Sequence, residues 1–292
     1  CRMKSIALTV LLAAAPVLAS DVYVSPQGNP SLAEAIQSSR TRPAGERCTI
    51  WLRGGTYEIS DPLMFDARDS GLTIAAQKGE KPVISGGKRV TGCKEVDGVW
   101  QTKVENWHFR SLFVNGRRAV IARTPNVGQF FRMRGERLSD KPPQFKFAAG
   151  EIKRHWLQEP DATVVAFEKW TDFRRYIRAI ETNDVVRHSG NAASHTHESG
   201  ARYFVENTAD SMDAPGEWHL DRRTWLARYR PLQGETLDSA ETIAPRLEEL
   251  VVIKGASNVV LRGLTFSHTD WVMPEDGYTD RQAAVHVPGD LR

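Results

Sequence analysis

The sequence predicts an all-β protein folded as a right-handed parallel β-helix, with a short N-terminal capping helix and an inserted antiparallel β module. Short apolar strands recur towards both ends of the 292-residue chain, as in residues 72–84 and 250–266. The corners between them contain Gly, Asn or Asp, and few carry the dipeptides of tight hairpins. Only residues 32–39 have the apolar spacing of a convincing helix. Short strands with regular corners are typical of a solenoid.

The composition is that of a globular protein with a substantial core, at 40% hydrophobic and 26% charged residues. The length suits one large β domain or two smaller ones. The net charge is +3, with Lys and Arg scattered among Asp and Glu, so we expect no nucleic-acid partner. The pairs Arg174–Arg175 and Arg222–Arg223 are interpreted as strand-edge or surface residues that could also bind an acidic sugar.

The first residues predict an export signal. Arg2 and Lys4 precede an apolar run that ends at Val17-Leu18-Ala19, so cleavage is expected after Ala19. This run is too short and too alanine-rich for a membrane span, and no later stretch is a candidate. We therefore expect a periplasmic or extracellular protein with no stable membrane insertion.

Two cysteines, Cys48 and Cys93, remain after the predicted cleavage. An oxidising compartment permits a bond between them, but two cysteines in so long a chain are not a disulfide framework. We interpret them as small buried hydrophobic residues in strands, and the sequence leaves their bonding state open. No CxxC-type spacing occurs, and we predict no metal site and no cofactor.

The predicted N-terminal elements are a strand around residues 22–24, a turn at 25–28 and the helix at 32–39. Ser31 and Glu34 form a capping box at the start of this helix. An open solenoid end exposes apolar core and unpaired strand edge, so we expect the helix to cover it.

The middle of the chain lacks the solenoid rhythm. Asn115-Gly116 lies between two alternating strands and predicts a hairpin. The aromatic, alternating stretches that follow predict an antiparallel module inserted between coils. The expected organisation is a signal peptide (1–19), an N-terminal cap with the first coils (20–105), the inserted β-rich module (106–247) and the resumed solenoid (248–292).

The stretch "MDAPGEWHLDRRTWLARYRP" contains three acids, Asp213, Glu217 and Asp221, beside two tryptophans. A glycosidase pair needs two carboxyl groups facing each other at about 5–5.5 Å or about 6.5–9.5 Å. The alternation of apolar residues instead favours a hairpin with arms at 217–220 and 225–229. We predict the hairpin and retain Glu217 as a candidate for substrate binding.

The corner "FSHTDWVMPEDGYTD" supplies the other candidates for substrate binding. Trp271 could stack on a sugar ring, and His268 or Asp270 could hydrogen-bond sugar hydroxyls. Alternatively, Trp271 packs against the inserted module while the acids of this corner are solvated. Those further acids are Glu275, Asp276 and Asp280.

His195 and His197 form an HxH pattern, which on a strand would place both imidazoles on one face. A zinc site would need further ligands from elsewhere. Within a polar loop, we predict that both are solvated surface histidines.

The ordered motifs resemble those of a known group. "VYVSPQGN", "IWLRGGTYEISDPLMF", "LFVNGRRAVIARTPN" and "LVVIKGASNVVLRGLTFSHTDW", with Pro215-Gly216-Glu217-Trp218 followed by Asp221, together resemble secreted right-handed parallel β-helix proteins related to glycoside hydrolase family 141. The resemblance implies hydrolysis of plant cell-wall polysaccharide, with fucosidase- or xylanase-type activity. It also implies a longer chain with the catalytic acids on later coils. We therefore expect a solenoid truncated at its C-terminus, catalytic residues beyond Arg292, and no turnover by this fragment.

Two rival functions remain open. A polysaccharide lyase would need a cation or Arg to neutralise a uronate and a base near the α-proton. A carbohydrate-binding or adhesive solenoid would need no chemistry, and fold analogy does not exclude it. In all three cases the expected partner is a polysaccharide or oligosaccharide, and we predict a monomer.

Overall fold

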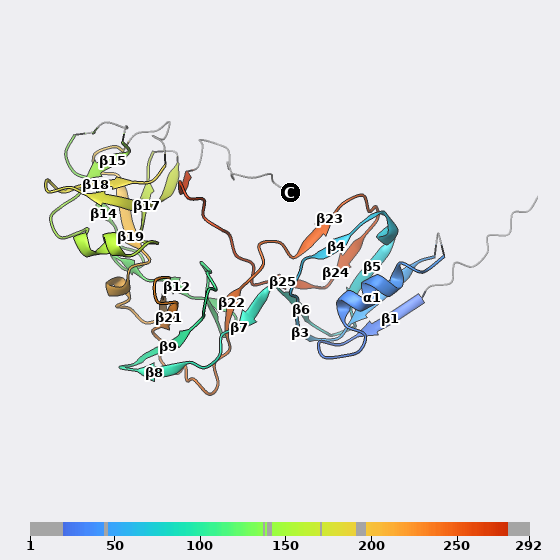
Figure 1. The fold of residues 1–292 in the computed structure, drawn as a ribbon. Helices are drawn as coiled ribbons and strands as arrows, with labels where there is room; N and C mark the ends of the chain where they lie inside the picture. Colours follow the sequence, from blue (N-terminus) through green and yellow to red (C-terminus); the bar gives the residue numbers. More distant parts are fainter. Residues whose placement is uncertain are drawn as a thin grey trace, which may run out of the picture. The chain divides into compact units, whose positions relative to one another are not determined.

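The computed structural model describes residues 20–43, 46–136, 138, 142–169, 171–190 and 197–279. The predicted signal peptide, His195, Asp280 and the final apolar stretch at 283–291 lie outside these ranges. The chain forms two compact units, described separately below (Figure 1). Unit 1 is Cys1–Glu58, Leu63–Ile84 and Val251–Phe266, and unit 2 is Ile59–Pro62, Ser85–Leu250 and Ser267–Arg292.

The prediction of a right-handed parallel β-helix is wrong. The described residues are mostly β with one α-helix, but they form six small sheets of mixed orientation and no solenoid. The apolar runs and Gly-containing corners specify strands and turns locally. They do not specify which strand pairs with which, because that choice depends on the burial of faces by distant parts of the chain.

A parallel four-stranded sheet forms the centre of unit 1, in the order β1 (Ser20–Val24), β2 (Cys48–Leu52), β5 (Leu72–Ala76) and β24 (Val260–Arg262). Ile50 of β2 is opposite Val22 on one side and Ile74 on the other. Alternate residues of β2 are buried, which gives this sheet one apolar face.

Helix α1 (Leu32–Ser39) contacts β1 and β2, and its predicted bounds and capping box are confirmed. The Ser31 backbone N–H donates to Glu34 Oε2 at 2.7 Å, and the Glu34 N–H donates to Ser31 Oγ at 3.3 Å. These bonds satisfy two N–H groups that the helix itself leaves unpaired. Leu32, Ala35 and Ile36 form its buried face.

The remaining short elements of this part of the chain are β3 (Gly55–Glu58), β4 (Leu63–Phe65), the 3-10 helix η1 (Ala67–Asp69), β6 (Pro82–Ser85), β23 (Val251–Ile253) and β25 (Thr265–Ser267). Strands β4 and β23 pair in parallel, and β6 lies between β3 and β25. Cys48 is buried in β2 as interpreted, whereas Cys93 of unit 2 is half-buried outside the strands. Both are free thiols.

The largest sheet of unit 2 is antiparallel at every pairing that the described residues define. Its strands are β13 (Arg123–Thr124), β14 (Phe131–Arg132), β15 (Gln144–Lys146), β16 (Thr163–Phe167), β17 (Asp172–Ile180), β18 (Val185–His188), β19 (Arg202–Glu206) and β26 (Tyr278–Thr279). One face packs on a core that includes Trp156 from the 3-10 helix η2 (Arg154–Gln158), Phe173 and Tyr203.

A five-stranded sheet has the order β12 (Val120–Ile121), β20 (Glu217–Asp221), β21 (Leu226–Tyr229), β9 (Val99–Lys103) and β8 (Lys94–Val96). The 3-10 helix η3 (Ala209–Ser211) precedes β20. Strands β20 and β21 pair antiparallel, with Trp218 opposite Tyr229. This confirms the predicted hairpin in the stretch rich in acids and tryptophans.

The third sheet of unit 2 has the order β11 (Arg117–Arg118), β10 (Phe113–Val114), β22 (Thr242–Pro245) and β7 (Gly87–Arg89). Strands β10 and β11 form the predicted hairpin around Asn115-Gly116. Both turn residues have positive φ, 51° and 74°, as a type I′ turn requires.

His197 does not lie on the surface, so the prediction of a solvated histidine is wrong at this position. The side chain is buried, with its Nε2 2.9 Å from Nε2 of His188 and its Nδ1 3.1 Å from Oε1 of Glu168. Its ring also packs against Phe145 and Phe173. The polar loop sequence indicated exposure, but these partners compensate for burying the imidazole.

Candidate functional site

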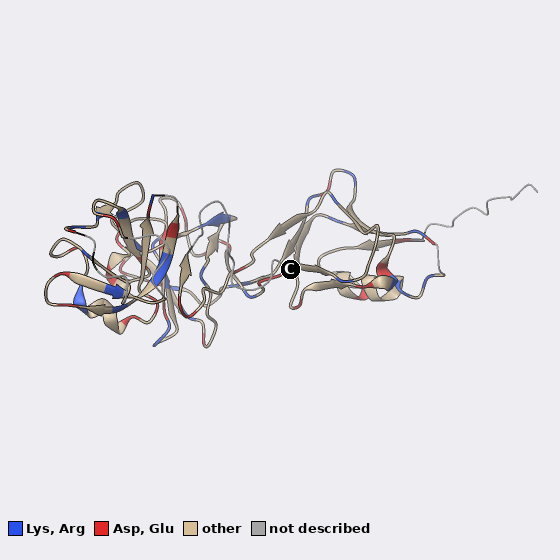
Figure 2. Cartoon of the chain, turned by 90° about the horizontal axis from the view of Figure 1, so that it is seen from above, with Lys and Arg blue, Asp and Glu red and all other residues tan. Residues whose placement is uncertain are grey.

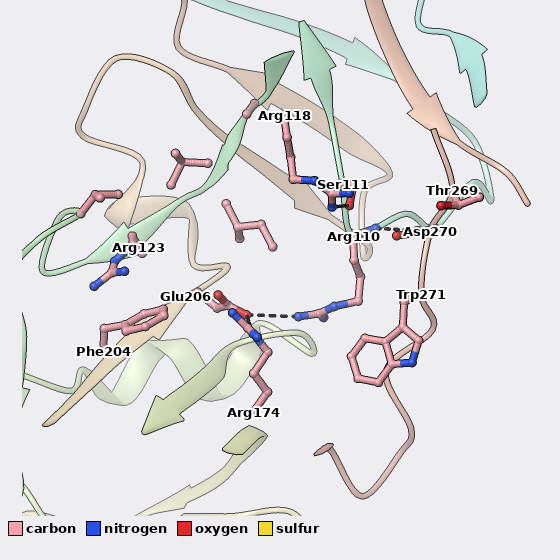
Figure 3. Close-up of a pocket in the computed structure, with 14 residues that line it drawn as sticks. Arg110, Ser111, Arg118, Arg123, Arg174, Phe204, Glu206, Thr269, Asp270 and Trp271 are labelled. Carbon is pink, nitrogen blue, oxygen red and sulfur yellow. Dashed lines mark hydrogen bonds and ion pairs between the residues drawn. The ribbon is translucent and has the colours of Figure 1, made fainter. Parts of the chain in front are cut away.

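A cavity of about 470 Å³ lies in unit 2 between the antiparallel sheet, the β10–β13 segment and the segment that follows β25 (Figure 3). Its wall includes four arginines, and we call it the arginine cavity. It is lined by Arg110, Ser111, Arg118, Ala119, Val120, Ile121, Arg123, Val127, Arg174, Phe204, Glu206, Thr269, Asp270 and Trp271.

Strand alternation explains why polar side chains of the large sheet face this cavity. Tyr203 and Val205 of β19 point into the core, so Phe204 and Glu206 point to the opposite face. Two register relationships place arginines there. Arg123 is opposite Glu206, and Arg174 and Phe204 are both opposite the same residue of β16.

Glu206 lies between two of the arginines. Its Oε1 accepts hydrogen bonds from Nη2 of Arg110 at 3.3 Å and from Nε of Arg174 at 3.2 Å (Figure 3). The side chains of Glu206 and Arg110 are only 5% and 9% exposed. A buried carboxylate costs much free energy unless it is paired, and these two bonds provide the pairing.

The other two arginines have no carboxylate as a hydrogen-bond partner among the described residues. Arg118 donates to the Ser111 hydroxyl and lies 4.9 Å from the centroid of the Phe113 ring. Arg123 donates to the carbonyls of Pro125 at 2.9 Å and Gln129 at 3.0 Å, and its guanidinium lies 3.5 Å from the Phe204 ring centroid. Burial lowers the pKa of Arg123, although nearby carboxylates oppose this effect.

Asp270 and Trp271 line the cavity on the side across from Arg123 and Phe204 (Figure 3). The Arg110 backbone N–H donates to Oδ2 of Asp270 at 2.8 Å, and burial raises the pKa of the Asp270 carboxyl group. The Trp271 side chain is 37% exposed and contacts Tyr278 edge to face at 5.4 Å. Trp271 therefore adds a part-exposed aromatic residue to the lining of the cavity.

Two buried polar atoms of residues that line the cavity have no hydrogen-bond partner within the described ranges. They are Nη1 of Arg110 and Oδ1 of Asp270. Buried polar groups are nearly always paired, because an unpaired one costs about 1–3 kcal/mol. These two atoms are a donor and an acceptor whose hydrogen bonding the described residues leave incomplete.

The structure places the four predicted site residues in different surroundings. Asp270 and Trp271 line the arginine cavity, and His268 and Glu217 do not. His268 is buried, with Nδ1 2.8 Å from the Ser85 hydroxyl and its ring 4.8 Å from the Phe113 ring centroid. Contact of any of the four with substrate stays a prediction.

Glu217 is buried and is the first residue of β20, directly after a turn. Its Oε2 accepts the backbone N–H groups of Asp213 and Ala214, each at 3.0 Å. Burial raises the pKa of its carboxyl group, and these hydrogen bonds oppose the rise. This geometry closes a turn, in agreement with the interpretation of the stretch as a hairpin.

Sequence reasoning missed Arg110, Arg118, Arg123 and Glu206 as cavity residues. Basic and acidic positions are interspersed throughout the described chain, so no local charge cluster marks them (Figure 2). The sequence indicated Arg174 only weakly, as part of an arginine pair that could bind an acidic sugar. Its neighbour Arg175 is buried and donates to the Thr279 hydroxyl, so the interpretation of both as edge or surface residues is wrong for Arg175.

The described residues contain no group of three or more His, Cys, Asp or Glu side chains placed to hold a metal ion. Among the same residues, no helix has both the length and the apolar character needed to cross a membrane.

No protein-family description matches this sequence, and no curated protein matches it. A solved structure described as a glycoside hydrolase is similar to 86% of this chain, with a TM-score of 0.76 and 26% sequence identity. The match covers 51% of that protein, so this chain spans about half its length. A second structure, "The complex structure of XylC with xylose", matches 88% of this chain and 36% of its own at 15% identity. Its TM-score of 0.36 is too low to support an argument.

The similarity establishes a glycoside hydrolase-like relationship for the fold. A relationship to glycoside hydrolase family 141 in particular stays a prediction.

Proposed function

We propose that this chain is part of a secreted, carbohydrate-active protein of the glycoside hydrolase type. The observation that carries the proposal is the similarity to a glycoside hydrolase, with a TM-score of 0.76 over 86% of this chain. A solvent-accessible tryptophan beside polar side chains in one cavity supports it, because aromatic faces and hydrogen-bonding groups together recognise sugars.

We further propose that the substrate is a plant cell-wall polysaccharide, cleaved with fucosidase- or xylanase-type activity, and that the catalytic acids lie beyond Arg292. The two carboxylates of the cavity already have hydrogen-bond partners, and this supports placing the catalytic acids outside this chain. A glycosidase needs one protonated acid and one carboxylate that attacks or activates water. Glu206 is held by two arginines, and Asp270 Oδ2 is held by a backbone amide.

A polysaccharide lyase is the second candidate, because arginines can neutralise the carboxylate of a uronate. A lyase also needs a base near the α-proton. Lys, Arg, His or Tyr could be that base, and of these the lining of the arginine cavity contains Arg. We favour the hydrolase because of the similarity to a glycoside hydrolase, and product analysis separates the two.

The test compares two forms of the protein on a panel of plant polysaccharides. We expect the 292-residue chain to bind oligosaccharides in calorimetry without releasing reducing ends. The same polypeptide extended through the remaining half of the glycoside hydrolase fold should release reducing ends. N-terminal sequencing of the exported protein should find Ser20 as the first residue.

Three outcomes would contradict parts of this proposal. Hydrolysis by residues 1–292 alone would place the catalytic acids within them. Unsaturated uronate products, detected by their ultraviolet absorbance, would identify a lyase. Failure of both forms to bind any glycan would refute a carbohydrate-active protein.

A further inference from the structure

We propose that the arginine cavity binds the anionic group of an acidic sugar, either the carboxylate of a uronic acid or a sulfate ester. This inference rests on the proposed function, because that function supplies the sugar. It adds the charge of the substrate and the residues that recognise it.

The cavity wall is rich in positive charge. Four arginines face two carboxyl groups, Glu206 and Asp270, so positive charge exceeds negative charge within one cavity. The lining carries four guanidinium groups and two carboxyl groups, whereas the net charge of the whole chain is only +3. An anion entering the cavity would be attracted by this field, most strongly at low ionic strength.

Part of the arginine charge has no partner among the described residues. Glu206 accepts from Arg110 and Arg174 together, so one carboxylate serves two guanidinium groups. Nη1 of Arg110 is buried and has no hydrogen-bond partner within the described ranges, although the side chain is only 9% exposed. A carboxylate or sulfate oxygen would complete this guanidinium with a charge-assisted bond.

Arg118 is accessible. It is exposed, and among the described residues its guanidinium donates a hydrogen bond to a neutral group, the hydroxyl of Ser111. A guanidinium has five N–H donors, so Arg118 can bind an anion and keep this bond. Figure 3 shows Arg118 and Arg110 on neighbouring parts of the same wall.

The part of the wall that contains Asp270 and Trp271 suits a sugar ring. Trp271 offers an indole with 37% exposure, and the unpaired Oδ1 of Asp270 can accept a hydrogen bond from a hydroxyl. The volume of about 470 Å³ is within the range of small-molecule sites, ~300–1,000 Å³. The cavity thus combines an anion-binding wall with a wall for an apolar ring face and a hydroxyl.

Isothermal titration calorimetry on the whole chain tests the proposal with three probes. These are an oligogalacturonide, its fully methyl-esterified form as the uncharged match, and a sulfated oligosaccharide. Arg118→Gln is the main variant, because the exposed side chain can change without disturbing the core. Arg223→Gln is the matched control, since Arg223 is also a part-exposed arginine of unit 2 but pairs with Asp221 outside the cavity.

We expect the oligogalacturonide to bind at least tenfold more tightly than its methyl ester. Arg118→Gln should weaken that binding by about 10- to 100-fold, which corresponds to the loss of one charge-assisted hydrogen bond. Arg223→Gln should leave the affinity within about twofold, because surface ion pairs outside a site contribute little. If only the sulfated probe binds, with the same response to Arg118→Gln, the anion is a sulfate ester and the proposal holds.

The proposal is overturned if the methyl ester binds as tightly as the acid, or if Arg118→Gln leaves binding of both anionic probes unchanged. Trp271→Ala gives an independent check, because it should weaken binding without removing the preference for the charged probe. If neutral oligosaccharides bind and acidic ones have no advantage, this inference fails while the proposed function stands. If no oligosaccharide binds, neutral or acidic, the proposed function itself fails.

Discussion

The backbone N–H of Arg110 donates a hydrogen bond to Oδ2 of Asp270 at 2.8 Å, although the two residues are 160 positions apart in the chain. The guanidinium of the same arginine binds Glu206 of β19. Arg110 therefore connects the segment that carries Trp271 with the large antiparallel sheet, and it lines the arginine cavity between them.

Replacing Asp270 should loosen this connection. Asp270→Ala removes the acceptor of the Arg110 amide and leaves a part-buried N–H unpaired, which costs about 1–3 kcal/mol. We expect a lower free energy of unfolding in urea denaturation. Asp270→Asn keeps a carbonyl oxygen that can accept the same bond, so it should lose less. Equal losses in the two variants would show that the hydrogen bond is not the cause.

Glu217 should contribute to stability more than to ligand binding. Its carboxylate accepts two backbone N–H groups at the turn before β20, and Glu217→Ala would leave both without this acceptor. We expect a loss of about 2–4 kcal/mol, with a smaller loss for Glu217→Gln, which retains one oxygen. Denaturant unfolding measures the stability. A large loss of oligosaccharide affinity in a folded Glu217→Gln variant would contradict this expectation.

Stability should fall as the solution is acidified, partly because of His188. Burial, with help from His197, lowers the pKa of His188 from its ordinary 6.5 to about 3. Between these values the unfolded chain binds a proton that the folded chain excludes, so the stabilisation is present above the unfolded pKa and declines as the pH falls towards 3. From about pH 7 to about pH 5 the expected loss is about 2 kcal/mol.

The control for this prediction is His188→Gln, which has no titrating group at the position. From about pH 7 to about pH 5, the free energy of unfolding of the variant should fall by about 2 kcal/mol less than that of the unsubstituted protein. Denaturant unfolding at both pH values measures this difference. Identical pH dependence in the two proteins would show that His188 does not exclude the proton.

Alanine substitutions at Gly277 and Gly116 distinguish the cost of backbone strain from the cost of lack of space. Both have positive φ, 77° and 74°, so an alanine at either position costs about 1 kcal/mol or more. A Cβ at Gly277 would also lie 2.5 Å from the Arg174 carbonyl oxygen and 2.9 Å from Cα of Arg175, whereas a Cβ at Gly116 meets nothing within 4 Å. We therefore expect Gly277→Ala to destabilise by about 2–3 kcal/mol more than Gly116→Ala in thermal or urea unfolding.

The elements that could be predicted from the sequence depend on contacts between close neighbours in the chain. The capping box of Ser31 and Glu34 specifies where helix α1 begins, and Asn115-Gly116 specifies the β10–β11 turn. The β20–β21 hairpin also follows from local alternation. In each case the interacting residues are so close in sequence that few alternative partners compete.

The predicted solenoid failed because strand pairing is not a local property. Strand β12, for example, pairs in parallel with β20, and β9 pairs antiparallel with β21. Apolar runs at both ends of the chain were consistent with parallel coils, but the same runs also suit small mixed sheets. Only the combined burial of the faces of all strands selects among these pairings.

The sequence by itself determined that the described part of the chain is mostly β and contains a capped helix, and it pointed to the segment that contains Asp270 and Trp271. Only the tertiary structure decided that Arg110, Arg118, Arg123, Arg174 and Glu206 meet that segment around one cavity. The physical reason is that these side chains come from different strands and loops. Their convergence depends on register and on which face of each strand is buried, and a single local pattern contains neither.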